Sequence, residues 1–133
     1  MKKLFLFIAI IGSLYSCKKD SLSDRYQEFA GTWEFEQYSG YPFTSTPLPA
    51  GNGKIIYIGS DKTYERRSFD TVLVRATYSL EERKDCSGNE KKIFFKSTDP
   101  NAFESIISIE NGKLYLSASN CLADGGINIY RRK

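Results

Sequence analysis

Eight short runs of strand-forming residues, separated by turn residues, constrain the fold of this chain more than any other feature. Tyr, Phe, Ile and Thr recur in these runs, which favours β-structure. No long apolar pattern with a 3.6-residue period accompanies them, so we expect little helix. The eight runs are Thr32–Ser39, Lys54–Gly59, Thr63–Ser68, Val72–Glu81, Lys92–Ser97, Glu104–Glu110, Lys113–Ser119 and Gly126–Arg132.

One hairpin can be aligned residue by residue. The Asn111-Gly112 pair between two apolar runs is typical of a type I′ turn. The turn predicts three cross-strand pairs, with opposite charges on one face and apolar residues on the other. These pairs are Glu110 with Lys113, Ile109 with Leu114, and Ile107 with Leu116.

The run from Val72 to Glu81 alternates apolar and more polar residues, so it indicates a sheet with one apolar face. Eight antiparallel strands must bury that face, and closure of the sheet on itself also removes its exposed edges. We therefore expect an all-β, eight-stranded antiparallel up-and-down barrel over residues 30–133. A two-sheet sandwich satisfies the same pattern and remains an alternative.

The first 16 residues have the features of an export signal. Lys2 and Lys3 form a basic start, and the apolar run Leu4–Gly12 is too short for a permanent membrane-spanning helix, which needs about 20 residues. The segment Leu14–Cys17 resembles the lipobox of bacterial lipoproteins. An ordinary cleaved signal peptide, with Cys17 as an incidental first residue, is the alternative interpretation.

The lipobox resemblance implies that Cys17 carries a diacylglycerol thioether and an N-linked acyl chain such as palmitate. Several acyl chains hold a protein on a membrane, at about 0.8 kcal/mol per buried methylene. Residues 18–29 are polar and are interpreted as a tether, so that 17–29 form the lipidated cysteine and its linker. Lys18-Lys19-Asp20 resembles the surface-export tag of some Bacteroidetes lipoproteins. We expect the outer membrane, on its periplasmic side or exposed at the surface.

Charge and composition argue against two classes of function. Loss of Lys2 and Lys3 with the signal lowers the formal net charge from +3 to +1. This charge is too small to indicate a basic surface for nucleic-acid binding. The chain has no histidine, so it has no Ser-His-Asp triad, Cys-His pair or imidazole metal site. Glu34 and Glu36 share a strand face about 7 Å apart, but a solvated outer face explains them better than a catalytic pair. We expect no enzyme, no cofactor and no metal.

Short motifs at both ends of the domain resemble the lipocalin-like domains of small Bacteroidetes lipoproteins. Gly31-Thr32-Trp33 opens the first run, and Tyr130-Arg131-Arg132 closes the last. The resemblance covers most of residues 30–132 and includes three further motifs: Asp61-Lys62-Thr63-Tyr64, Ala76-Thr77-Tyr78-Ser79 and Cys121-Leu122-Ala123-Asp124-Gly125-Gly126.

This resemblance implies that Trp33 plugs the closed barrel end and that Arg132 lies across its indole. Such a cation–π contact is worth roughly 0.5–2 kcal/mol. Strand alternation leaves Arg131 as a competing partner, because Arg131 shares a face with apolar Ile127 and Ile129.

Cys86 and Cys121 remain as a pair in an oxidising, exported setting. A disulfide between them closes a loop of about 36 residues and stabilises by roughly 4 kcal/mol. In a strict meander, however, the fourth and seventh connections lie at opposite barrel ends, beyond the roughly 7 Å that a disulfide tolerates. Either no bridge forms or the strand count differs by one.

An eight-stranded barrel is filled by side chains or holds one small ligand. If Tyr64 points inward, Arg66 does too, and with tyrosines such as Tyr78 it could hold an anionic head group, for example a fatty-acid carboxylate. The lipocalin-like resemblance implies a protein that binds a small apolar or amphipathic molecule in the bacterial envelope. The alternative is a filled barrel that contacts an unknown protein partner through the 40–53 loop, with Tyr41, Phe43 and Leu48.

Overall fold

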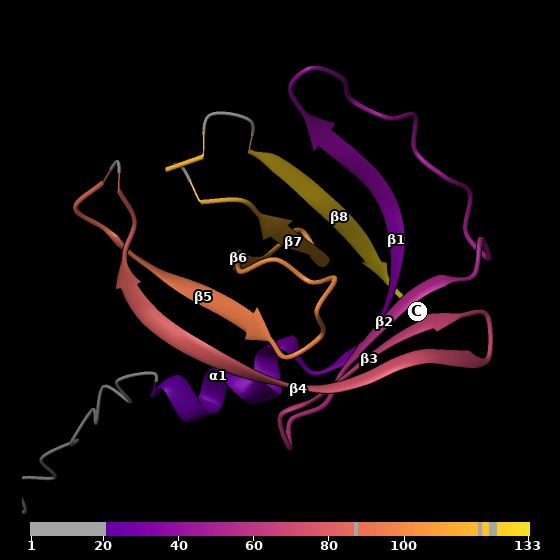
Figure 1. Cartoon of the computed structure of the whole chain (residues 1–133), viewed down its shortest axis with the longest axis horizontal. Helices are drawn as coiled ribbons and strands as arrows, with labels where there is room; N and C mark the ends of the chain where they lie inside the picture. The colour runs from indigo at the N-terminus through magenta and orange to yellow at the C-terminus, as the bar shows by residue number, and fades with distance from the viewer. Residues whose placement is uncertain (1–20, 87, 120, 123–124) are drawn as a thin grey trace, which may run out of the picture.

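Eight antiparallel strands, joined in chain order, close into a barrel in the computed structural model (Figure 1). Pairing of the first strand with the last completes the ring, which confirms the expected lipocalin-like up-and-down barrel and excludes the sandwich. The strands are β1 (Gly31–Gly40), β2 (Lys54–Ile58), β3 (Thr63–Ser68), β4 (Thr71–Lys84), β5 (Lys91–Ser97), β6 (Ser105–Glu110), β7 (Lys113–Ser117) and β8 (Gly126–Arg132).

The structure describes residues 21–133 apart from 87, 120 and 123–124. The expected export signal, residues 1–16, and the expected lipidation site, Cys17, lie outside the described residues. No helix within the described ranges is both long enough and apolar enough to cross a membrane.

The β6–β7 hairpin has the predicted register. Asn111 and Gly112 both take positive φ, 51° and 74°, which is the backbone conformation of the type I′ turn. All three predicted cross-strand pairs, from Glu110 with Lys113 to Ile107 with Leu116, are present. Local turn chemistry and the apolar face therefore determine this hairpin together.

The barrel core comes from the inward-facing alternate residues of the strands, as their period of two requires. Trp33, Ile58 and Leu114 are fully buried in it. The rest of the buried cluster is Phe29, Ile56, Tyr64, Tyr78, Leu80, Phe95, Ile107 and Leu116.

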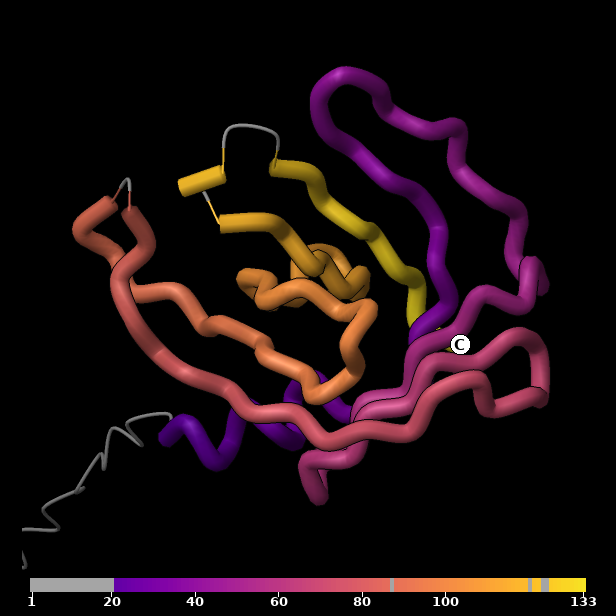
Figure 2. The backbone as a smooth tube through the Cα atoms, in the orientation of Figure 1, coloured from indigo at the N-terminus to yellow at the C-terminus, as the bar shows by residue number. Residues whose placement is uncertain are grey.

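A short helix, α1 (Leu22–Phe29), replaces most of the expected tether. The Asp24 carboxylate accepts the N–H of Ser21 at 3.2 Å, as in a capping box. Leu22, Tyr26 and Phe29 follow an i, i+4, i+7 spacing and pack against the core, so the helix covers one end of the barrel beside β4 (Figure 2). The interpretation of this segment as a plain tether is wrong because one apolar face of two turns is enough to dock a helix.

The long first connection, residues 41–53, lies along β1. The Ser45 N–H donates to the Tyr38 carbonyl and the Leu48 N–H to that of Glu36, at 2.9 and 2.8 Å. Glu34 is only 3% exposed beneath this loop, and its carboxylate accepts the N–H of Gly51 at 2.9 Å. The prediction that Glu34 lies on a solvated outer face is therefore wrong. The loop covers its carboxylate and donates a backbone hydrogen bond to it.

Cys86 and Cys121 form a disulfide, with their Cα atoms 5.5 Å apart. The barrel therefore has eight strands and also the disulfide. The expectation that these two features exclude each other is wrong. The reason is that only two residue pairs join β5 to β6, and on β5 these pairs involve Phe94 and Phe95. Beyond them the β4–β5 hairpin leaves the regular meander and approaches the β7–β8 connection, as Figure 1 shows at the upper left.

Candidate functional site

Two adjoining cavities lie at the barrel end opposite α1, here called the open end. The outer cavity is about 390 Å³ and the inner cavity about 160 Å³. Ile56, Arg66 and Tyr130 line both and so form the wall between them. The outer cavity is also lined by Phe35, Lys54, Ile55, Arg67, Ser68 and Leu73. Further lining of the inner cavity includes Tyr64, Phe95, Asp99, Phe103, Leu116 and Asn128.

Arg66 is the central charged group of this site. It shares the inward face of β3 with buried Tyr64, and its Nε donates to Asp99 Oδ2 at 3.1 Å. The Asp99 side chain is fully buried, whereas that of Arg66 is 36% exposed. Burial raises the pKa of Asp99, but the Asn101 N–H and the Arg66 guanidinium outweigh it and hold the net pKa below its ordinary value. Asp99 is therefore ionised at neutral pH and balances the charge of Arg66.

Two tyrosines line the inner cavity as neutral groups. Burial, reinforced by the negative charge of Asp99, raises the pKa of Tyr64 to about 12. Burial also raises the pKa of Tyr130, whose ring meets Phe35 edge-on at 5.6 Å. Both phenols keep their proton at neutral pH, so each can donate a hydrogen bond to a polar ligand atom.

Lys54 adds a second positive charge at the mouth of the outer cavity. Its ammonium lies 5.7 Å from the centroid of the Phe35 ring. Within the described part of the chain it forms no ion pair, whereas the neighbouring Arg67 is bound to Glu65 at 2.8 Å. Lys54 is therefore the cation of this rim that has no acidic partner among the described residues.

Tyr78, expected beside Arg66, lies elsewhere. Its ring stacks on Phe95 at 5.0 Å and faces Tyr26 of α1 at 5.5 Å, and its hydroxyl donates to the Gly59 carbonyl. The placement in the ligand pocket is wrong because β4 continues past the paired part of β3, so position 78 lies at the end that the helix covers. Tyr78 is part of the closed-end core.

At that closed end, the Arg132 guanidinium lies over the Trp33 ring, 4.4 Å from its centroid. The indole N–H donates to the Phe29 carbonyl at 2.9 Å, which ties the plug to α1. Arg131 points to the outer face and contacts the Leu48 carbonyl of the long loop. Strand alternation thus directs the two arginine side chains to opposite faces of β8, and Arg132 is the one that lies on the indole.

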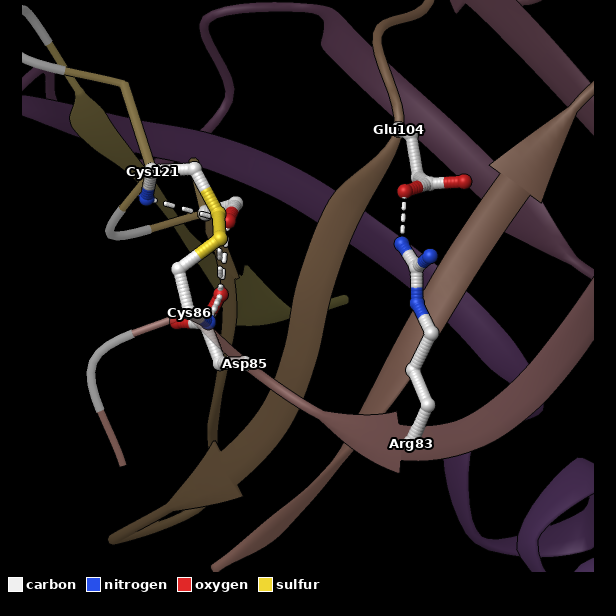
Figure 3. Close-up of a disulfide and its surroundings, with 6 residues drawn as sticks. Arg83, Asp85, Cys86, Glu104 and Cys121 are labelled. Carbon is white, nitrogen blue, oxygen red and sulfur yellow. Dashed lines mark hydrogen bonds and ion pairs between the residues drawn. A yellow bond between two sulfur atoms is a disulfide. The ribbon is translucent and has the colours of Figure 1, made fainter. Parts of the chain in front are cut away.

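A larger cavity of about 620 Å³ separates β5 from β6 beyond their two paired residues. Its lining mixes both signs of charge, with Arg25, Lys91 and Lys92 against Glu82 and Glu110. Ser119, one of its lining residues, donates its hydroxyl to Asp85 at 2.6 Å. Figure 3 shows Asp85 beside the disulfide. Asp85, Cys86 and Cys121 converge there, but the two sulfurs bond to each other and so offer no thiolate to a metal ion.

Sequence reasoning found Tyr64 and Arg66 of the open-end site but missed Asp99, Lys54 and Tyr130. Alternation could have found two of them, because Lys54 shares a face with Ile56, and Tyr130 shares one with Arg132. No local pattern indicates that the carboxylate of Asp99, in a turn before Pro100, faces the barrel interior.

Comparison with known proteins identifies no relative of this chain. Neither a protein-family model, nor a curated protein, nor a solved structure matches this chain. The functional argument therefore depends on the geometry of the site.

Proposed function

We propose that this chain is a lipid-anchored envelope protein of lipocalin-like type whose barrel binds one small amphipathic anion at its open end. The observation that carries the proposal is the outer cavity, where an apolar wall meets a cationic rim. Phe35, Ile56 and Tyr130 supply the apolar wall, and Lys54 and Arg66 supply the positive charge.

Size and chemistry of the cavity support a ligand with one apolar tail. Ligand pockets of about 300–1,000 Å³ typically combine apolar walls with a few placed polar groups, and 390 Å³ falls in this range. A carboxylate matches the guanidinium fork of Arg66, whose charge-assisted hydrogen bonds are stronger than neutral ones. A fatty-acid-like molecule satisfies both requirements.

The proposed lipid anchor would determine how the binding site is oriented relative to the membrane. Lipid chains on Cys17 would hold the barrel at the outer membrane, on its periplasmic side or at the surface. The helix α1 begins at Leu22, so only a few residues separate the anchor from the closed end. The open end and its cavity then point away from the anchor.

Charge reversal at the rim tests the binding proposal. We expect a dansyl-labelled undecanoic acid to bind the full Cys17→Ala chain at one equivalent, with Lys54→Glu weakening the affinity about tenfold. The matched control is Lys96→Glu, an exposed lysine of β5 that lines none of these cavities. Fluorescence titration measures all three affinities. Absence of saturable binding, or equal loss in both variants, contradicts the proposal.

Exposed aromatic residues favour one second candidate function, which is contact with a protein partner through the 41–53 loop. Tyr41 and Phe43 are 75% and 62% exposed, whereas Leu48 is half-buried and bonded to β1 through its backbone. Aromatic residues are enriched in protein interfaces. If Tyr41→Ser with Phe43→Ser leaves the dansyl affinity unchanged but abolishes a cellular role that Lys54→Glu retains, this second function is favoured.

A further inference from the structure

The β5–β6 connection, residues 98–104, lies over the inner cavity and is fixed at both ends. At one end the Thr98 N–H donates to the Thr77 carbonyl at 2.9 Å. At the other end Glu104 is paired with Arg83 of β4, as Figure 3 shows. These two anchors hold the ends of the segment independently of what its middle contacts.

The middle of this segment is held on the barrel interior by one charged contact. Among the described residues, the Arg66–Asp99 ion pair is the single hydrogen bond or ion pair that joins residues 99–103 to a strand other than β5 or β6. Ala102 and Phe103, which follow Asp99, also line the inner cavity. Loss of the ion pair would thus free a five-residue lid without breaking a strand pair.

Arg66 is only partly engaged by Asp99. Its Nε makes the one hydrogen bond that its guanidinium forms within the described chain, although a guanidinium carries five donors. Its side chain is 36% exposed and borders both cavities. A ligand carboxylate in the outer cavity can therefore approach the same guanidinium and form the bidentate contact that Asp99 does not make.

We propose that Asp99 acts as an internal competitor for the anion site: an incoming carboxylate takes Arg66 from it and releases the 99–103 lid. This inference rests on the proposed binding function. A buried carboxylate without its partner is unfavourable, so Asp99 must move to solvent when it loses Arg66. Binding of an anion is thereby coupled to opening of the inner cavity, whereas binding of a neutral amphiphile is not.

Two matched ligands and two matched variants test this coupling. Dodecanoate and dodecanol have the same chain length but differ in charge, and calorimetry measures their affinities for the full Cys17→Ala chain. Asp99→Asn should raise the dodecanoate affinity roughly tenfold to a hundredfold, because the competing charge is gone, and leave the dodecanol affinity unchanged. Asp70→Asn, which removes an exposed acid on the β3–β4 turn, should change neither affinity.

Hydrogen exchange gives a second readout that does not depend on the variant. In the chain with Asp99 present, dodecanoate should increase exchange of residues 99–103, and dodecanol should not. The competitor role is overturned if exchange of residues 99–103 is unchanged and Asp99→Asn alters both affinities equally or alters neither. The binding function stands in that case. Absence of binding of either ligand to any variant overturns the binding function and this inference with it.

Discussion

At the residue scale, the two inward arginines show how one side-chain type serves two purposes at the two barrel ends. Arg132 lies on Trp33 at the closed end, close to Gly31, where a Cβ atom would approach its guanidinium to 3.0 Å. Arg66 at the open end faces two cavities and is balanced by Asp99. Arg132 is therefore a structural group, whereas Arg66 is the group through which we propose that a ligand is recognised.

Truncation of Arg132 should measurably destabilise the barrel. Arg132→Ala removes a cation–π contact at an exposed site and the packing of the aliphatic stem, so we expect the free energy of unfolding to fall by about 1 kcal/mol. Urea unfolding followed by the fluorescence of Trp33, the single tryptophan, measures this change. Lys133→Ala is the control, and an equal effect of the two substitutions would show that the contact does not stabilise the plug.

At the element scale, the β4–β5 hairpin is the part of the barrel that departs most from a regular meander. Seven residue pairs join β4 to β5, from Tyr78 with Ser97 to Lys84 with Lys91, but only two join β5 to β6. The hairpin is held from the other side by the disulfide and by the buried carboxylate of Asp85, which accepts the Ser119 hydroxyl at 2.6 Å. The disulfide thus fastens the sheet where strand pairing ends.

Removal of this disulfide should lower stability more than any surface substitution. In the chain-entropy model a loop of this length contributes about 4 kcal/mol, so Cys86→Ser with Cys121→Ser should lose roughly that amount. Denaturant unfolding of the variant and of the reduced parent chain should agree, and dithiothreitol should leave the variant unchanged. Stability that does not respond to reduction in the parent chain would contradict the bridge.

At the scale of the whole molecule, the barrel has a closed end beside α1 and an open end with two adjoining cavities. The helix α1 and Trp33 close the first end, and the cavities beside Arg66 occupy the second. A lipid anchor on Cys17 would place the closed end toward the membrane. Under our proposal, the cavities beside Arg66 would then be accessible from the aqueous side.

The proposed anchor can be tested in cells. Metabolic labelling with an alkyne analogue of palmitate should tag the parent chain, because the proposed modification attaches acyl chains to Cys17. Cys17→Ala should lose the label, whereas Cys121→Ser should retain it. Labelling that survives Cys17→Ala would contradict lipidation at this residue.

The sequence was sufficient for the strands because strand alternation and turn chemistry act locally, and the Asn111-Gly112 hairpin is the clearest case. Barrel closure was expected, but the β1–β8 pairing was needed to exclude the sandwich. The sequence was insufficient for α1, since Leu22, Tyr26 and Phe29 form too short an apolar face to stand out. Alternation put Arg66 on the same strand face as Tyr64, but it did not decide whether that face is inside and could not place Tyr78 along the barrel axis. The partner of Arg66 was missed because Asp99 reaches it from a connection 33 residues away in sequence.

The most direct test of the central claim is native mass spectrometry of the full Cys17→Ala chain purified from its natural host. The account predicts a discrete adduct of small-molecule mass at one equivalent, lost on denaturation and reduced in Lys54→Glu but retained in Lys96→Glu. Identification of the released molecule should show an anionic head and an apolar tail. A bare mass for the parent chain, unchanged after incubation with dodecanoate, would contradict a ligand-binding barrel.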